Sequence, residues 1–535
     1  MKKITIQITG MTCDHCAKSA QAALNAMQGV DATVSYDEGL ATAEIHDNID
    51  DKQLIKAIES IGYGAVIIGG SGLHIAIVGT GSAAFAAAIK AVEQGAQVTI
   101  IEGADIIGGT CVNTGCVPSK IMIRGAHIAH IQGQHNFSGV AFNTPVINRR
   151  AMVHQQQEWV KNLRHAKYES ILESNPEINL IRGVARFKDS STLVVTQTDG
   201  SEKEINADRI LLAVGARPMI PDIKGLSDTP YWTSTEALVA EEIPEHLIVL
   251  GGSAVALELA QAFRHLGSAV TIMARSTLLS KEEADIGHGL KKILEDDGLK
   301  IELNTLPNGI SHDGKKFTVS TENADVNCDQ LLIATGRQSN ADTLALNKAG
   351  VTLAHNGSII IDDHMRTNIK NIYAAGDCTN QAQYVYVAAA AGTRAARNMT
   401  GDDVALDLSA MPAVVFTNPP VATVGLAEQQ AKAQGLNVES RKLELENVPR
   451  ALANMDTRGF IKLLAEKDTG RIIGCQIIAH EAGEVIQTAA VAICNNMTVK
   501  NLADQLFPYL TMVEGLKLTA QTFYKDVNKL SCCAG

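Results

Sequence analysis

The chain has 535 residues, a length that suits roughly three or four domains. It is 46% hydrophobic and only 4% aromatic with 44 glycines, a composition typical of α/β proteins that bind nucleotides. The net charge of −12 and the lack of a basic block argue against nucleic acid or an anionic membrane as partners. No apolar run reaches about 18 residues and the first segment alternates like a strand, so we expect no membrane span, no signal peptide and a cytoplasmic location.

Residues 1–68 are expected to form a small domain of their own. The hydrophobic pattern predicts six elements in chain order. They are a strand at 4–9, a helix from Cys16 to about Met27, strands at 31–36 and 40–45, a helix at 51–60 and a strand at 64–68. The resulting order βαββαβ is the ferredoxin-like arrangement. The glycine-rich residues 69–73 that follow are predicted to be a flexible linker.

Two cysteines of this first domain, Cys13 and Cys16, are predicted to lie at an exposed junction of a loop and a helix. Two sulfurs there can bind a soft metal ion with linear geometry. The competing interpretation is a thioredoxin-like redox site, but the flanking Trp-Cys-Gly-Pro pattern is missing. The segment 10–16, GMTCDHC, matches the motif of heavy-metal-associated domains, which this domain resembles. The resemblance implies metal binding by Cys13 and Cys16. We expect His15, which lies between them, to be solvated rather than a ligand.

A dinucleotide-binding unit is predicted to begin with the strand 75–78. The turn after it carries Gly79, Gly81 and Ala84, a Gly-x-Gly-x-x-Ala pattern that lets the backbone approach a pyrophosphate at a helix N-terminus. A second strand ends at Glu102, 23 residues after Gly79, where an acid suits a ribose hydroxyl.

A second unit of the same kind follows the strand 247–250, with Gly251, Ser253 and Ala256 at the corresponding positions of the turn. Ser253 replaces the middle glycine but keeps a small side chain at the pyrophosphate. The strand that should carry the acid ends instead at Arg275, with Lys281 six residues on. Cations there accommodate a 2′-phosphate, so NADPH is favoured over NADH.

The segment 108–120, GGTCVNTGCVPSK, places Cys111 and Cys116 five residues apart. Near i, i+4 spacing on one helix would set both sulfurs on one face, close enough for a disulfide or a shared soft metal ion. A helix N-terminus also lowers the pKa of a thiol. A structural disulfide is the alternative, but paired cysteines in a reducing compartment indicate redox chemistry.

Two dinucleotide turns around a dithiol indicate a flavin at the first turn and a nicotinamide at the second. Hydride from NADPH would reduce the flavin, which would deliver an electron pair to the disulfide. Asp377 follows a strand near 372–376 and could hold a flavin ribityl hydroxyl, although a structural turn is the alternative.

After Pro412 the composition changes and a further core domain is predicted, with strands near 413–416 and 459–465 and helices near 484–496 and 512–526. The chain ends in a small polar tail with adjacent Cys532 and Cys533, which we expect to be reduced because vicinal cysteines bridge only with strain. A disordered tail with incidental cysteines is the alternative. The remaining single cysteines are expected to be buried small hydrophobes, namely Cys328, Cys378, Cys475 and Cys494.

Residues 73–535 resemble the flavin-dependent pyridine nucleotide-disulphide oxidoreductases through the segment 108–120. The resemblance implies one FAD per subunit beside Cys116, with Cys111 as the outward thiol and Lys120 near the flavin and paired with Glu258. It implies a homodimer in which the C-terminal domain completes the partner's active site. It also implies an FAD site lined by Ala84, Glu102, Thr110, Asp377 and the backbone around Ala185 and Val385.

The fold class expected is α/β: two Rossmann-like dinucleotide-binding domains and an α+β dimerisation domain, preceded by the ferredoxin-like metal-binding domain. The predicted division of the chain is a heavy-metal-associated domain at 1–68, a linker at 69–73, an FAD domain at 74–220 that resumes at 341–410, an NADPH domain at 221–340, and a dimerisation domain at 411–535 with the Cys532–Cys533 tail.

One departure from the family motif concerns acid/base chemistry. Where the disulfide-reducing members carry His-Pro, this chain has Phe507-Pro508, ahead of Glu514. Reduction of an organic disulfide requires a proton for the leaving thiolate, which a histidine supplies and Phe507 cannot. A metal ion that accepts two electrons needs no such proton. The missing histidine, the Cys532–Cys533 tail and the metal-binding front domain together indicate a soft, thiophilic cation as the substrate.

This combination resembles the mercury-reducing members of the family. The resemblance implies NADPH-dependent reduction of Hg(II), supplied as a thiol complex, to volatile Hg(0), and hence mercury detoxification. The ion would pass from the Cys13/Cys16 pair, a small thiol carrier or a mercury transport protein to Cys532 and Cys533 of the partner subunit, and then to Cys111 and Cys116. Tyr168 and the partner's Tyr509 would line the inner metal site, although packing is the alternative for both.

Two other functions remain open on the sequence alone. One is a disulfide reductase with an unusual thiol substrate, which leaves Phe507 unexplained. The other is a metal-buffering protein with a vestigial flavin core, against which the two complete nucleotide turns argue. No cluster of histidines in the sequence supports a second metal centre. We expect the front domain to contribute only modestly when small thiols are abundant, and organomercurials not to be cleaved.

Overall fold

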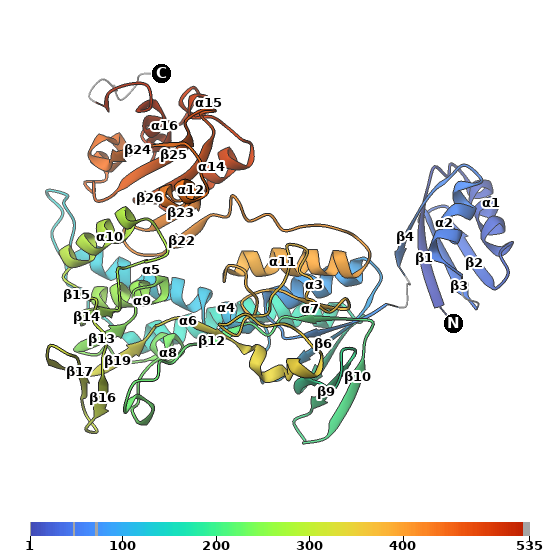
Figure 1. The fold of residues 1–535 in the computed structure, drawn as a ribbon, viewed down its shortest axis with the longest axis horizontal. Helices are drawn as coiled ribbons and strands as arrows, with labels where there is room; N and C mark the ends of the chain where they lie inside the picture. Colours follow the sequence, from blue (N-terminus) through green and yellow to red (C-terminus); the bar gives the residue numbers. More distant parts are fainter. Residues whose placement is uncertain (1, 47–48, 70–72, 528–535) are drawn as a thin grey trace. The chain divides into compact units, whose positions relative to one another are not determined.

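The computed structural model describes residues 2–46, 49–69 and 73–527 (Figure 1). Its internal contacts divide the chain into two units. The first comprises residues 1–113, 161–217 and 338–406, and the second comprises residues 114–160, 218–337 and 407–535. Each unit holds one of the two dinucleotide turns predicted from the sequence.

The front domain of unit 1 has the predicted ferredoxin-like order. Its antiparallel sheet has the strand order β2-β3-β1-β4. Ile4, Ile6 and Ile8 alternate along β1 and are buried against the two helices, because side chains at every second strand position share a face. The elements are β1 (Lys2–Thr9), α1 (Asp14–Asn25), β2 (Val30–Ser35), β3 (Leu40–Ile45), α2 (Asp51–Glu59) and β4 (Gly64–Gly69).

A parallel five-stranded sheet of order β21-β11-β5-β6-β7 forms the core of the rest of unit 1. Helices α3 and α11 run side by side on it (Figure 1). A Cβ on Gly392 would lie 2.1 Å from the Ala83 carbonyl oxygen, so glycine allows this close approach. The elements are β5 (His74–Val78), α3 (Ser82–Glu93), β6 (Gln97–Glu102), β7 (Ile178–Arg182), β11 (Arg209–Leu212), β21 (Ile372–Ala374) and α11 (Val385–Met399).

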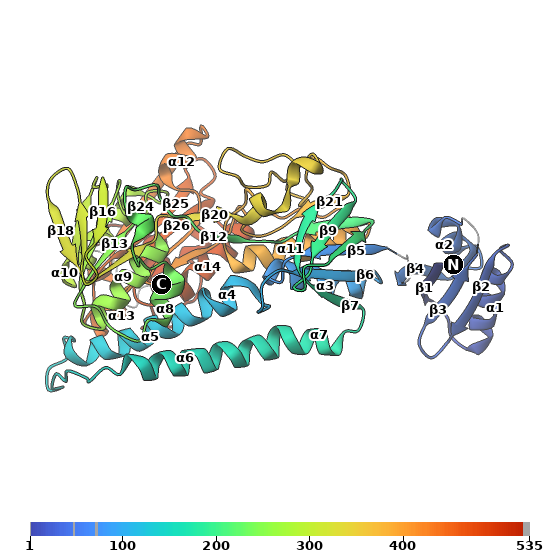
Figure 2. The ribbon, with the colours of Figure 1, turned by 90° about the horizontal axis from the view of Figure 1, so that it is seen from below.

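Smaller elements complete unit 1, and the long helix that leads into it begins in unit 2, to which residues 149–160 belong. An antiparallel ribbon consists of β8 (Val184–Phe187), β9 (Thr192–Thr196) and β10 (Glu202–Asn206). Figure 2 shows α6, a π-helical turn and α7 as one continuous rod. Its segments are α6 (Arg149–Arg164), the π-helix η1 (His165–Glu169) and α7 (Ser170–Ser174), and two 3₁₀ turns lie at Asn340–Leu344 and Leu346–Lys348.

Unit 2 contains the second parallel sheet, of order β15-β14-β13-β19. Helix α5 packs on α9, and Met122 and Ala126 of α5 belong to the same buried cluster as the apolar face of α9. The elements are α5 (Cys116–Gly133), α8 (Ser234–Val239), β13 (His246–Leu250), α9 (Ala254–His265), β14 (Ala269–Ala274), α10 (Ala284–Asp296), β15 (Lys300–Leu303), β16 (Gly309–His312), β17 (Phe317–Ser320), β18 (Asp325–Cys328) and β19 (Gln330–Ile333).

The last domain of unit 2 is built on an antiparallel sheet of order β22-β23-β26-β25-β24. Helix α14 packs on β23 and β26, and α16 packs on β24 and β25. The elements are β22 (Ala413–Val415), β23 (Val421–Gly425), α12 (Glu428–Ala433), β24 (Val438–Glu444), α13 (Pro449–Ala453), β25 (Phe460–Glu466), β26 (Ile472–Ile478), α14 (Ala482–Cys494), α15 (Val499–Ala503) and α16 (Glu514–Gln521).

The two parallel sheets repeat one detail at their first strands. The ring nitrogens of His74 lie 2.9 Å from the Asn206 carbonyl oxygen and 2.9 Å from Thr99 Oγ1. The ring nitrogens of His246 make the same pair of contacts in unit 2, with the carbonyl oxygen of Asn327 and the hydroxyl of Thr271. This matching supports the prediction of two dinucleotide-binding units of the same kind.

No helix among the described residues is long and apolar enough to cross a membrane.

Candidate functional site

The first dinucleotide turn lies between β5 and α3. Gly79 has a φ of 109°, and a Cβ there would lie 2.4 Å from the Ala213 carbonyl oxygen, so the position requires glycine. A Cβ on Gly81, which precedes α3, would meet nothing within 4 Å. The N-terminus of α3 is therefore open, and its amide groups can bind a phosphate.

The acid predicted to face this turn, Glu102, is the last residue of β6. Its carboxylate accepts hydrogen bonds from the Thr80 hydroxyl and, at 2.8 Å, from the Ala104 amide. Thr80 in turn accepts from the Gly108 amide at 3.2 Å, which links the turn to the glycine pair before the redox segment. The predicted acid thus lies at the carboxyl edge of the sheet, beside the turn.

The other residues expected at the flavin have different settings. Ala84 is fully buried within α3, and Ala185 is buried in β8. Asp377 follows β21 and is partly buried. Val385 is the first residue of α11, and Thr110 lies in the short helix α4 (Gly109–Asn113).

The second dinucleotide turn has the same design within unit 2. Gly251 has a φ of 135°, and its Cβ would lie 2.2 Å from the Ala334 carbonyl oxygen. Ser253 is the N-cap of α9, and Ala256 is fully buried in its first turn. Arg275 directly follows β14 and is exposed, as is Lys281. Two exposed cations therefore accompany a strand end that carries no acid.

The sequence analysis placed the two redox cysteines on one helix, but the structure places them on two. Cys111 lies in the short helix α4 (Gly109–Asn113), and Cys116 is the first residue of α5. Gly115 between them has φ −129° and ψ −110°, which is not helical, and it serves as the N-cap of α5. Both cysteines are partly exposed. Cys116 thus lies at a helix N-terminus, where the helix dipole favours a thiolate.

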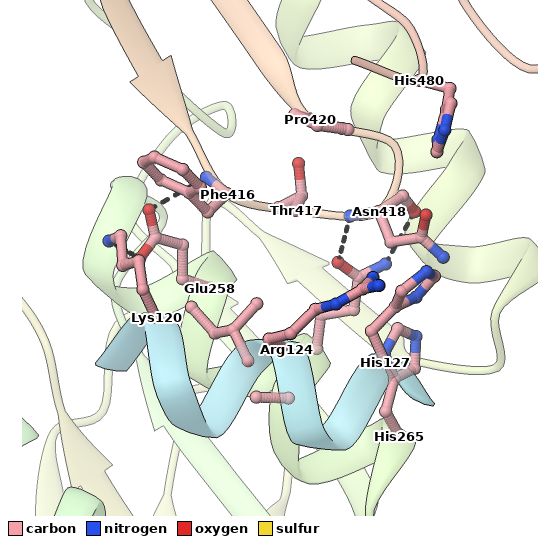
Figure 3. Close-up of a pocket in the computed structure, with 13 residues that line it drawn as sticks. Lys120, Arg124, His127, Glu258, His265, Phe416, Thr417, Asn418, Pro420 and His480 are labelled. Carbon is pink, nitrogen blue, oxygen red and sulfur yellow. Dashed lines mark hydrogen bonds and ion pairs between the residues drawn. The ribbon is translucent and has the colours of Figure 1, made fainter. Parts of the chain in front are cut away.

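Lys120 lies one turn after Cys116 on α5 and forms the ion pair with Glu258 that the resemblance implied (Figure 3). Its Nζ is 2.7 Å from Glu258 Oε2 and lies 4.4 Å above the centre of the Phe416 ring. The second carboxylate oxygen of Glu258 accepts from the Phe416 amide at 2.9 Å. The buried carboxylate is therefore satisfied on both oxygens. This pair lies at one end of a cavity of about 260 Å³.

At the other end of this cavity lie His127, His265 and His480, which the sequence analysis had not grouped, and His130 stacks on His265 beside them. His127 and His130 lie three residues apart on α5. Burial, and then the neighbouring His265, lowers the pKa of each imidazole to about 4. Ligand atoms of His130, His265 and Asp297 lie within 4.8 Å of one another. The i, i+3 spacing of His127 and His130 in the sequence was a signal that these two side chains lie on one face of the helix.

Geometry favours polar packing over a metal centre for this cluster. The rings of His130 and His265 stack at 3.8 Å with an angle of 18°, so their in-plane lone pairs run side by side and do not converge. The Asp297 carboxylate already accepts from Gln261 at 2.7 Å and from Arg458 at 3.1 Å.

The metal-binding motif of the front domain lies where the sequence predicted it. Cys13 is the exposed N-cap of α1, and its sulfur is 3.7 Å from that of Cys16. Hydrogen bonds from the Thr12 side chain, the Tyr63 hydroxyl and the Thr12 backbone lower the pKa of Cys16 to about 6. Tyr63, between α2 and β4, was missed by the sequence analysis, because its distance in the sequence gives no sign of this contact.

Three protein-family matches cover these sites. Residues 73–392 match the family described as pyridine nucleotide-disulphide oxidoreductase, and residues 411–520 match its dimerisation domain. Residues 5–64 match the heavy-metal-associated domain. The chain is 52% identical to mercuric reductase from Shewanella putrefaciens and 55% identical to that from Shigella flexneri, over 99% of this chain and all of each relative. The chain belongs to the mercuric reductases of the pyridine nucleotide-disulphide oxidoreductase family.

A third relative, mercuric reductase from Streptomyces lividans, is 42% identical and is matched over 99% of its own length, yet it spans only 87% of this chain. Solved structures support the fold. The flavoprotein disulfide reductase RclA from Escherichia coli superimposes with a TM-score of 0.75 and 30% identity, over 84% of this chain and all of RclA. LpdA from Mycobacterium tuberculosis gives 0.74 and 28%, over 85% of this chain and all of LpdA.

Family membership implies FAD and a pyridine nucleotide as cofactors, and two turns of this chain fit them. The open N-terminus of α3 at Gly81 has room for a pyrophosphate, and Ser253 at the N-cap of α9 leaves only a small side chain at the second turn. The match to the dimerisation domain supports a homodimer.

The aromatic residues near the predicted acid/base position lie in the last domain. Phe507 packs against the hydrophobic core of that domain, whereas the side chain of Tyr509 is 55% exposed. Glu514 is buried, which raises the pKa of its carboxyl. Cys532 and Cys533 lie outside the described residues. Tyr168 lies in the π-helical turn η1, which no signal in the sequence had indicated.

The prediction for the single cysteines is confirmed for three of the four. Cys328, Cys378 and Cys475 are buried, and burial raises the pKa of Cys328 and of Cys378 to about 12. The prediction for Cys494 is wrong, because this last residue of α14 lies on the exposed face of the helix.

Proposed function

We propose that this protein is an NADPH-dependent flavoenzyme that reduces Hg(II) to volatile Hg(0) and so detoxifies mercury. The observation that carries the proposal is the similarity to mercuric reductases over the whole chain, front domain included. Phe507, which packs against the apolar core of the last domain, supports it, because no imidazole at this position protonates the leaving thiolate of an organic disulfide.

The chain offers a place for each cofactor. Gly79, Gly81 and the N-terminus of α3 would hold the FAD pyrophosphate, one FAD per subunit, with Glu102 at a ribose. FAD bound there supplies two-electron transfer between the nicotinamide and the dithiol. Further FAD contacts would come from Ala84, Thr110, Lys120, Ala185, Asp377 and Val385.

The second turn would hold NADPH through Gly251, Ser253 and Ala256, with Glu258 on the same helix. Arg275 and Lys281 would bind the 2′-phosphate, since both are exposed cations beside a strand end that lacks an acid. We expect kcat/KM with NADPH to exceed that with NADH by about tenfold or more. Equal values for the two coenzymes would contradict this assignment.

The Cys111/Cys116 dithiol would bind Hg(II) as a dithiolate, and the two electrons that reduce the ion would come from NADPH by way of the flavin. Hg(II) prefers two thiolates in a line, so it can move between cysteine pairs by ligand exchange. Cys111 would be the outward thiol and Cys116 the inward one. Two electrons convert the bound ion to Hg(0), both Hg–S bonds break, and the two sulfurs remain as thiolates. Hg(0) has little affinity for thiolate and leaves.

A relay of cysteine pairs would deliver the ion. It would start at Cys13 and Cys16, at a small thiol carrier or at a mercury transport protein, and pass through Cys532 and Cys533 of the partner subunit. Tyr168 and the partner's Tyr509 would line the inner site, which therefore needs a homodimer. The relay requires reduced thiols, which suits the cytoplasm.

A disulfide reductase is the second candidate function, because RclA, at 30% identity, is a flavoprotein disulfide reductase. The test compares initial rates of NADPH oxidation by the FAD-loaded dimer with Hg(II) in excess thiol and with glutathione disulfide. We expect Hg-dependent oxidation and none above background with the disulfide. Turnover of the disulfide without any response to Hg(II) would refute the proposed function.

A further inference from the structure

Tyr168 lies in a π-helical turn, η1, that separates α6 from α7. A π-turn inserts one residue into a helix and turns the following side chains relative to the preceding ones, and such turns recur at functional sites. The turn spans His165–Glu169 and is flanked directly by Arg164 and Ser170. The direction of Tyr168 therefore depends on what holds this turn in place.

The ring of Tyr168 packs against the first turn of α3 and against the glycine pair that precedes Cys111. It stands edge-on to Phe85 of α3, with the ring centres 4.9 Å apart at 90°. Its hydroxyl is 3.4 Å from Ser82 Oγ at the start of α3. A Cβ on Gly108 would lie only 3.3 Å from Cδ2 of the Tyr168 ring. The ring thus lies on the glycine pair that leads into α4 and Cys111.

One side chain, Arg164, forms hydrogen bonds both to the π-turn and to α4, the short helix that carries Cys111. Its Nε donates to Glu169 Oε1 at 3.1 Å, at the end of the π-turn. One terminal nitrogen donates to Asn113 Oδ1, also at 3.1 Å. Burial alone would raise the pKa of Glu169, but the bonds from Arg164 and His165 outweigh it and lower the pKa. The Arg164 side chain is only 18% exposed, so its bonds are partly shielded from water.

Asn113 passes this connection on to the segment that carries Cys111. It ends α4, two residues after Cys111, and its Nδ2 donates to the carbonyl oxygens of Ile107 at 2.8 Å and Gly109 at 2.9 Å. These two bonds close the loop around Gly108. A planar guanidinium can hold two acceptors in fixed directions at once, which a lysine ammonium cannot.

We propose that Arg164 is a positioning residue that fixes Tyr168 relative to the Cys111 segment for reduction of the metal ion. It acts through Asn113 on one side and through Glu169 on the other. The inference rests on the proposed function. A displacement of Tyr168 of about 1 Å is enough to cost up to two orders of magnitude in rate, because catalysis depends on alignment at this scale.

The alternative is that the pair Arg164–Glu169 only stabilises the helix, as surface ion pairs do weakly. The same helix offers a matched control for that role. Arg150 of α6 donates to Glu241 at 2.7 Å, and its side chain is 79% exposed. Arg150→Gln removes an ion pair of α6 without touching the Tyr168 turn.

The experiment is a double-mutant cycle on the FAD-loaded dimer. Arg164→Gln, Tyr168→Phe and the double variant are compared for kcat and KM with Hg(II), and for NADPH oxidation by ferricyanide, which takes electrons without needing the thiols. We expect Arg164→Gln to lower kcat for Hg(II) about tenfold with ferricyanide turnover within about twofold of wild type. The double variant should lose no more than Tyr168→Phe alone, because the two residues act as one unit.

Several outcomes would overturn the inference. Strictly multiplicative losses in the double variant would show that Arg164 does not act through Tyr168. A parallel loss of ferricyanide turnover would show a general structural role, as would an equal effect of Arg150→Gln. Arg164→Lys, which keeps the charge but not the fork, should restore only part of kcat, so full restoration would also contradict it. If the wild-type protein fails to reduce Hg(II), the proposed function fails first, whereas normal Hg(II) turnover in Arg164→Gln refutes only this inference.

Discussion

The two described cysteine pairs of this chain are built in different ways. Cys13 and Cys16 lie on an exposed loop and helix start, with their sulfurs 3.7 Å apart and a pKa of about 6 for Cys16. Cys111 and Cys116 lie on two successive helices. The hydrogen bonds that Asn113 donates to backbone carbonyl oxygens hold the glycine segment that leads into Cys111. The first pair is thus accessible, with a pKa at Cys16 that favours the thiolate at neutral pH, and the second is held in a defined backbone.

This difference separates capture of an ion from its reduction. Capture by ligand exchange needs an exposed thiolate and tolerates movement. Reduction needs an acceptor held in a fixed position relative to the electron donor. The comparison therefore predicts large effects for changes at the Cys111/Cys116 pair and its supports, and small effects for changes in the front domain.

The largest effect is expected for Cys111→Ala. Without this sulfur Hg(II) has no second thiolate at the inner pair, and we expect kcat for Hg(II) to fall by about a thousandfold or more while NADPH oxidation by ferricyanide is kept. The matched variant Cys13→Ala should keep kcat within about twofold in excess thiol, because other thiols replace the first pair. Equal losses in both variants, measured by NADPH oxidation, would remove the distinction between capture and reduction.

A smaller effect is expected at the ion pair that anchors α5, the helix that begins with Cys116. Glu258→Gln removes the charge that pairs with Lys120, one turn from Cys116, and leaves that ammonium beside Phe416. We expect the free energy of unfolding to fall by about 1–3 kcal/mol, less than for a fully buried pair because Lys120 is partly exposed. Urea unfolding measures the change, with the exposed pair Lys188–Glu204 as control.

Lys188→Gln should leave the urea unfolding midpoint unchanged within error, since both partners of that pair face solvent. A loss as large as that of Glu258→Gln would show that the pair near Cys116 is no more than an ordinary surface contact.

The residues that hydrogen-bond to Cys16 should control how the reactivity of this thiol depends on pH. The pKa of Cys16 is lowered to about 6 from an ordinary value of 9, so its reactive thiolate persists at neutral pH and is lost as the pH falls through 6. We expect the rate of Cys16 alkylation by iodoacetamide, followed by peptide mass spectrometry, to rise with a midpoint near pH 6. Thr12→Val and Tyr63→Phe should each move the midpoint upward, because the hydrogen bonds of these residues stabilise the thiolate. An unchanged midpoint in both variants would contradict the role assigned to them.

The smallest effect is expected when the front domain is removed altogether. A chain that begins at Leu73 should retain at least about half of kcat with Hg(II) in excess small thiol, since ligand exchange with the thiol supplies the inner pair. Loss of nearly all turnover would show that the domain is obligatory.

The fold was predictable because its patterns are local. The alternation of β1 and the glycine turns at Gly79 and Gly251 predicted the ferredoxin-like domain and both parallel sheets. Local patterns also limited the prediction. Gly115 interrupts the helix expected across both redox cysteines, because it is in a non-helical conformation as the N-cap of α5.

Contacts between distant segments could not be predicted from periodicity. Tyr63 reaches Cys16 from a loop far along the chain, and the π-turn that carries Tyr168 leaves no mark in the helical pattern of its sequence. The exposed position of Cys494 depends on which face of α14 is covered, and an apolar neighbourhood in the sequence does not determine that.

The central claim is that the electrons of NADPH end on mercury. The most direct measurement is anaerobic NADPH oxidation by the FAD-loaded dimer with Hg(II) in excess thiol, with the volatile metal trapped and quantified. We predict one Hg(0) released for each NADPH oxidised, and no release by Cys111→Ala or by the variant with both Cys532 and Cys533 changed to alanine. NADPH oxidation without trapped Hg(0), or Hg(0) release that survives in Cys111→Ala, would contradict the account.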